Sequence, residues 1–169
     1  MDQNSIIRHI IRLFILVFTQ VFILSNIHFA GYISPVVYLL FLYYFPSHEN
    51  KMLVLTLSFF TGLLLDILLD SLAFHTLALL IVTYLRTKLL RFVFGIAIEQ
   101  KSFRIQENPW PQRVSYLAVL LLIHHTVFFI AEGFSFAHGG LILKKIVTTF
   151  IASLVINLLL ISLFSKQKS

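Results

Sequence analysis

The chain contains no cysteine, and only 12% of its 169 residues are charged. The absence of cysteine excludes a disulfide scaffold, thiolate metal sites and thiol catalysis. The scarcity of charge excludes an ordinary soluble domain, in which roughly a quarter of the residues are charged. In their place, 59% of the residues are apolar, and the mean hydropathy is +0.93. This composition predicts a membrane protein without a separate soluble domain, because six spans of about 20 residues already need about 120.

Six apolar runs predict an all-α polytopic membrane protein, a compact bundle of six transmembrane helices forming one domain over residues 1–169. The expected spans are residues 12–29, 32–46, 52–69, 72–88, 114–132 and 143–164. No small-x-small cleavage site follows the first run, so we interpret it as a retained helix and not as a signal peptide. The second run is short and closed by Pro46, so it is expected to be thin, tilted or partly re-entrant.

The positive charges indicate the orientation of these spans. Six spans place both termini on one side, and a cytoplasmic placement puts eleven of the thirteen Lys and Arg residues inside. Only Lys144 and Lys145 then lie outside, as the positive-inside rule favours. We therefore expect a multi-pass protein of a cytoplasmic membrane with both termini in the cytoplasm. The net charge of +6 is explained by topology and does not indicate a nucleic-acid partner.

The one long linker, residues 89–113, alternates cations with bulky apolar residues such as Phe92 and Phe94. One interpretation is a cytoplasmic amphipathic helix on the inner leaflet, with its Lys and Arg residues near anionic lipid. The other interpretation is that this segment extends the fourth helix beyond the membrane. The sequence leaves both open.

The third expected helix carries Gly62, Asp66 and Asp70 at intervals of four, which places them along one stripe. An ionised carboxylate at the centre of a span costs about 2.5–3.5 kcal/mol, so Asp66 is expected to face protein or water. Gly62 would let another helix approach closely. The two carboxylates could form an acid/base pair or bind a metal ion. We favour the alternative in which Asp66 bonds a neighbouring helix and Asp70 caps the next one, since no nucleophile or phosphate loop accompanies them.

A second group of polar residues is expected at the outer ends of the helices. Asn26 and His28 lie at the outer end of the first span, His75 near the start of the fourth, and Glu132 at the end of the fifth, at the level of Asp70. Such a polar outer rim could form a binding surface, or it could simply satisfy helix ends.

Polar residues also occur deeper in the expected spans. His124 and His125 are expected to be buried, one packed and one hydrogen-bonded, because a metal site or proton relay would need further ligands. Gln20, and the stripe of Thr149, Ser153 and Asn157, are expected at interfaces between helices. The chain has none of the usual enzyme motifs. The residues therefore predict no catalytic site, metal or cofactor, and they fit a scaffold or a small-molecule-binding subunit.

Three stretches resemble the rod shape-determining protein MreD family. They are QVFILSNIHFAGYISPVVYLLFLYYFP from Gln20 to Pro46, GLLLDILLDSLAFHTLALLIVTYLR from Gly62 to Arg86, and AEGFSF from Ala131 to Phe136, which is similar to Bacteroidetes-like members. The resemblance covers nearly the whole chain in length and order of spans. The family commonly has a glycine near position 73, where this chain has Ala73.

The resemblance implies a non-enzymatic subunit of the bacterial rod complex, or elongasome, in the inner membrane. Its expected partners are an MreC-like bitopic protein, an MreB-like actin homologue and the cell-wall synthases that build lateral peptidoglycan. The implied fold is similar to the substrate-binding subunits of energy-coupling-factor transporters. The alternative is therefore a small-molecule-binding subunit of a vitamin-type transporter. An intramembrane hydrolase using Asp66 and Asp70 is a third hypothesis.

In the rod-complex hypothesis, the six helices dock the membrane helix of the MreC-like partner. Gly62, Asp66 and Asp70 would hold the third helix and shape the outer rim. Asn26, His28, His75 and Glu132 would contribute to the same rim. The basic inner loop would face anionic lipid or cytoplasmic partners.

Overall fold

The computed structural model describes residues 3–26, 34–100, 103–133 and 139–165, and all regular structure in them is helical. The expectation of an all-α protein is confirmed. The α-helices are α1 (Gln3–Phe22), α2 (Leu40–Tyr44), α3 (Lys51–Leu68), α4 (Phe74–Phe94), α5 (Trp110–Gly133) and α6 (Gly139–Ser165). The short 3-10 helices are η1 (Leu24–Asn26), η2 (Gly95–Glu99) and η3 (Ile105–Glu107).

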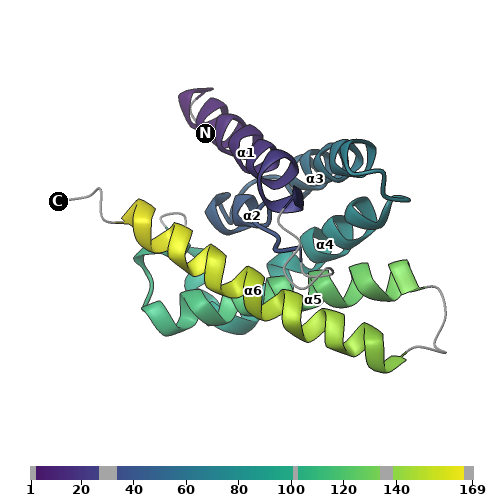
Figure 1. Cartoon of the computed structure of the whole chain (residues 1–169). Coiled ribbons are helices and arrows are strands. Elements are labelled where there is room, and N and C mark those ends of the chain that lie inside the picture. The colour runs from purple at the N-terminus through teal and green to yellow at the C-terminus, as the bar shows by residue number, and fades with distance from the viewer. Residues whose placement is uncertain (1–2, 27–33, 101–102, 134–138, 166–169) are drawn as a thin grey trace.

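The helices pack in chain order around the short central α2 (Figure 1). Helix α4 packs between α3 and α5, and α5 also packs along α6. Helix α1 contacts α2 and α3 and leaves one long side uncovered. Gly62 on α3 explains the close approach of α4, because a Cβ at this position would lie 2.5 Å from the Cα of Thr76. The expectation that Gly62 admits a neighbouring helix is therefore confirmed.

Within the described residues, four helical segments are long and apolar enough to cross a membrane, as expected of a multi-pass membrane protein. They are Ile7–Asn26, Lys51–Leu68, Trp110–Gly133 and Gly139–Leu163. Helix α4 has 21 residues, but its second half carries Arg86, Lys88 and Arg91. It therefore has a shorter apolar part than the other four.

The second expected span differs from the prediction. Of the described residues 34–46, only Leu40–Tyr44 form an α-helix, and residues 34–37 approach it as irregular chain. Over its described part, the expected helix at residues 32–46 is therefore corrected to a short helix that irregular chain precedes. This segment is almost wholly buried, and Val37, Leu39 and Leu42 have no exposed surface. Irregular backbone at membrane depth is tolerated where protein surrounds it, which explains how this segment can leave the helical form.

The basic linker, residues 89–113, begins as an extension of α4, which is one of the two interpretations that the sequence left open. Its first residues continue α4 without a break as far as Phe94, and the short helices η2 and η3 follow. The extension of the fourth helix is therefore the correct interpretation for residues 89–94. Phe94 is 7% exposed and packs inside, whereas Phe92 is 82% exposed. Helix α4 thus keeps an inward apolar face after its charged residues begin.

The corner between α3 and α4 is tight and uses two residues in the left-handed region. Asp70 has φ +51°, and Ala73, which precedes the first residue of α4, has φ +62°. Aspartate tolerates this region, whereas alanine pays a steric cost of roughly 1–2 kcal/mol. Ala73 occupies the position at which glycine would be the favoured residue.

We predict that Ala73→Gly stabilises the protein. Glycine removes the steric cost of the positive φ at this position, against a loss of chain entropy of roughly 0.5–1 kcal/mol. The melting temperature in detergent should rise by about 2–4 °C, which corresponds to about 1 kcal/mol for a chain of this length. Ala118→Gly, in the middle of α5, is the control and should lower it. A lower melting temperature for Ala73→Gly would contradict the assigned backbone conformation.

Candidate functional site

Asp66 lies at the end of α3 and caps the start of α4. One carboxylate oxygen accepts hydrogen bonds from the Ser71 hydroxyl at 2.6 Å and the His75 backbone N–H at 2.9 Å. The other accepts from the backbone N–H and the hydroxyl of Thr76, at 2.9 and 2.6 Å. The two N–H groups belong to the first turn of α4, which has no intrahelical acceptor for them. A negative charge at this helix start is also favoured by the helix dipole.

This geometry decides between the roles expected of the two aspartates. Asp66 bonds a neighbouring helix, as favoured, but it also performs the capping expected of Asp70. Asp70 instead forms part of the exposed turn. Asp66 is 5% exposed, and four donors surround its carboxylate. Its role in the described structure is to join α3 to α4.

Three buried side chains from different elements meet beside this corner. The Tyr38 hydroxyl lies 3.0 Å from Nδ1 of His75 and 2.7 Å from Nε2 of His124. Tyr38 and His124 are at most 1% exposed. His75 is the second residue of α4 and its backbone N–H donates to Asp66, so the backbone that Asp66 holds also places this ring. The hydroxyl therefore links α4 to α5 through the irregular segment.

Other polar side chains hold the backbone of the irregular segment itself. The amide of Gln20 accepts from the Val37 N–H at 2.9 Å and donates to the Pro35 carbonyl at 3.0 Å. On the opposite side, Ser153 accepts from the Val36 N–H at 2.9 Å, and Asn157 donates to the Val36 carbonyl at 2.6 Å. Side chains of α1 and α6 thus replace the hydrogen bonds that a helix would have made internally. Gln20, Ser153 and Asn157 were expected at helix interfaces, and they lie between helices as scaffolding for this backbone.

A cavity of about 740 Å³ opens at the end of the bundle where α3 ends and α4 begins. The expected rim residues Asn26, Asp70, His75 and Glu132 all line it. His28 lies outside the described residues. The structure therefore brings the described members of the polar rim together around one cavity. Gly62 and Asp66 do not line it and act through the corner that positions His75.

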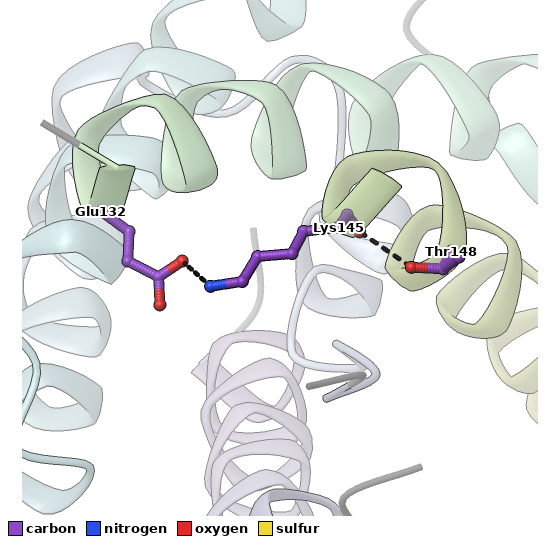
Figure 2. A network of polar contacts seen from close by, with 3 residues as sticks. All are labelled: Glu132, Lys145 and Thr148. Carbon is purple, nitrogen blue, oxygen red and sulfur yellow. Dashed lines mark hydrogen bonds and ion pairs between the residues drawn. The ribbon is translucent and has the colours of Figure 1, made fainter. Parts of the chain in front are cut away.

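Further lining comes from residues that the sequence did not assign to the rim. Lys145 of α6 donates to the Glu132 carboxylate at 3.0 Å, an ion pair that joins the end of α5 to the start of α6 (Figure 2). The Thr148 hydroxyl donates to the backbone carbonyls of Lys144 and Lys145. His124, His125 and Thr149 also line the cavity. His125 is satisfied by the Leu121 carbonyl and the Ser153 hydroxyl at 2.6 and 3.1 Å.

The opposite end of the bundle is organised by arginine. Arg86 of α4 is 5% exposed and donates to the carbonyls of Leu42, Phe45 and Pro46, at 3.2, 2.5 and 3.3 Å. These carbonyls lie in and just after α2, whose last C=O groups have no intrahelical donor. Arg113 of α5 donates to the Tyr43 hydroxyl at 2.8 Å. Charged and polar side chains on four helices therefore hold the irregular residues 35–37 at one end and α2 at the other.

Two of these residues were missed by sequence reasoning. Tyr38 lies in an apolar run, but a tyrosine at such a position needs a partner for its hydroxyl, and this need was the available signal. Arg86 was counted only as a topology charge. Nothing local to either residue indicates its partners, because these lie 37 to 86 residues away.

Among the described residues, no group of three or more His, Asp or Glu side chains could hold a metal ion. No protein-family model, no curated protein and no solved structure matches this chain. The described protein is thus an all-helical membrane protein with a polar cavity at one end. At the other end, Arg86 holds the carbonyls at the end of α2.

Proposed function

We propose that the chain is a non-enzymatic membrane subunit of a bacterial rod complex, binding an MreC-like partner and supporting cell shape and lateral peptidoglycan synthesis. The proposal rests on the resemblance of the stretch from Gly62 to Arg86 to the MreD family. This stretch forms the corner between α3 and α4. Gly62 allows the close approach of the two helices there, and Asp66 accepts hydrogen bonds from the first turn of α4.

The observation that carries the proposal is the engagement of the Asp66 carboxylate. Four hydrogen bonds from three residues occupy its two oxygens, so its charge is used to hold two helices together. A general acid would need a proton directed at a substrate, and a general base or a metal ligand would need a free lone pair. The hydrogen bonds of Asp66 therefore favour a structural subunit over an intramembrane hydrolase.

The uncovered side of α1 offers a surface for the partner's membrane helix. Phe14, Phe18 and Phe22 follow one another at intervals of four, and each is about 60% exposed. The rings of Phe18 and Phe22 lie 4.4 Å apart. Such a ridge of aromatic side chains can pack into the groove of a single transmembrane helix, for which close packing is the main source of affinity in lipid.

The test is gentle solubilisation of native membranes containing a tagged chain with a photo-crosslinking residue at Phe18. Mass spectrometry should identify an MreC-like protein crosslinked at this position and cell-wall synthases among the co-purifying proteins. The matched control carries the crosslinker at Ile151 of α6, which is exposed to a similar extent, 53% against 60%. Equal crosslinking at both positions would contradict α1 as the docking surface. Recovery of no rod-complex protein from either sample would contradict the proposed function.

The second candidate function is the small-molecule-binding subunit of a vitamin-type transporter. The cavity of about 740 Å³ favours it, because small-molecule sites commonly have volumes of about 300–1,000 Å³. The same purification separates the two functions. A transport subunit should bring with it a pair of ATPase subunits and a stoichiometric small molecule in place of the rod proteins.

A further inference from the structure

The cavity contains two buried polar atoms that the described part of the protein leaves without a hydrogen-bond partner. They are Nδ1 of His124 and the hydroxyl of Thr149. Both residues line the cavity, and each is 1% exposed. An unsatisfied buried polar atom is costly, so its presence in a cavity wall indicates a partner that occupies the cavity.

The hydrogen bonds of Tyr38 determine what the two histidines offer to such a partner. The hydroxyl can donate to only one of the two rings and must accept from the other. If it donates to Nδ1 of His75, neutral His75 carries its proton on Nε2, and His124 presents a bare Nδ1. If it donates to Nε2 of His124, the proton of His124 is on Nδ1, and His75 presents a bare Nε2. In either state the pair of rings has one donor and one acceptor left.

The charges around the cavity argue against an anionic ligand. Its lining holds Lys145, Glu132 and Asp70, and Lys145 is already paired with Glu132. With neutral histidines the lining therefore has a net charge of about −1. A phosphate or carboxylate would meet this negative charge, and the described lining residues offer it no unpaired cation.

The walls between the polar groups are aromatic and apolar. The ring of Phe128 lies 4.7 Å from that of His75 and is stacked on His124 at 6.2 Å. Phe74, Phe129 and Leu72 also line the cavity. These walls fit a ligand with a flat apolar body and a small polar head group.

We propose that this cavity is a binding site for an uncharged primary carboxamide carried on an aromatic or apolar body. Its carbonyl accepts from the imidazole that has a free N–H, and one amide N–H donates to the other imidazole. The second amide N–H donates to the hydroxyl of Thr149. A primary amide thus pairs the two unsatisfied atoms, Nδ1 of His124 and the Thr149 hydroxyl, and bonds His75 at the same time. This site is compatible with either candidate function and does not rest on the rod-complex proposal.

The experiment uses the full chain in detergent micelles with ring-¹⁵N-labelled histidine, and its probe is benzamide. Benzamide should produce saturable shifts of the His75 and His124 ring nitrogens, with a Kd on the order of millimolar for so small a molecule. Benzoate has the same shape with a negative charge, and acetophenone keeps the carbonyl but lacks the N–H groups. Both should bind at least about fivefold more weakly. No saturable shift at about 50 mM benzamide, or equal binding of benzoate, would overturn the proposal.

Two variants test the site itself. Thr149→Val removes a hydroxyl that bonds nothing in the described protein, so the melting temperature should not fall, while benzamide binding should weaken about fivefold. Tyr38→Phe should uncouple the two rings, which the ¹⁵N spectrum reports directly, and should weaken binding further. Tyr84→Phe, which removes the hydroxyl of an exposed tyrosine on α4, is the matched control and should bind like the wild type. Unchanged benzamide affinity in Thr149→Val and Tyr38→Phe would overturn the assignment.

Discussion

Replacing Asp66 with asparagine is expected to lower the free energy of unfolding by about 3–5 kcal/mol. The carboxylate accepts four hydrogen bonds, two at each oxygen. Asparagine keeps one acceptor oxygen and presents an NH₂ group to the donors on the other side. Two buried donors then lose their partner, and the start of α4 loses the negative charge that its dipole favours. Thermal unfolding in detergent should show the loss as a large decrease in melting temperature.

Asp70→Asn is the matched control for this experiment. It makes the same chemical change four residues along the chain, at an exposed position in the turn. Its effect should stay within about 0.5 kcal/mol. If Asp66→Asn folds, inserts and unfolds at the same temperature as the wild type, the carboxylate is dispensable and the role assigned to it is wrong.

Replacing Arg86 with methionine is expected to destabilise the protein by a similar amount, about 3–5 kcal/mol. Methionine retains much of the volume of the buried stem but leaves the carbonyls of Leu42, Phe45 and Pro46 without the guanidinium donors. Arg86→Lys should recover only part of the loss, because an ammonium group cannot reproduce the planar fork that reaches three carbonyls. The same unfolding experiment measures both variants.

Arg91→Met provides the comparison for Arg86. Arg91 lies on the same helix, but its ion pair with Glu99 is 3.5 Å long and largely exposed. Exposed pairs contribute about 0–1 kcal/mol, so this variant should behave nearly as the wild type. Equal losses for Arg86→Met and Arg91→Met would show that burial of the guanidinium has no special importance.

The parts that sequence reasoning predicted well depend on local spacing. Gly62 and Asp66 lie on one stripe of α3 and meet residues 71–76, which complete the turn and begin α4. That both residues contact the following helix could therefore be predicted from helical periodicity. The polar rim followed from the alternating direction of the spans, which places one end of each helix at the same level. The order of the spans and the helical period were sufficient to predict both features.

The central segment could not be predicted in the same way. Its apolar composition resembles that of a spanning helix, and only its shortness and Pro46 signalled another form. What holds it in place is distant in sequence, since Val36 bonds Ser153 and Asn157 across 117 and 121 residues. The Asp66 cap was assigned to Asp70 for a related reason, because spacing alone does not show how sharply the chain turns. A single sequence contains no direct signal for such pairings.

The position of these distant partners also constrains the order in which the protein can assemble. Residues 35–37 leave the ribosome long before α6, yet Ser153 and Asn157 on α6 supply two of the four side-chain hydrogen bonds to their backbone. Gln20 is available early and can hold one edge of the segment while the later helices are made. Arg86 fixes the far end once α4 is present. The centre of the bundle therefore reaches its final form last, when the C-terminal helix packs against it.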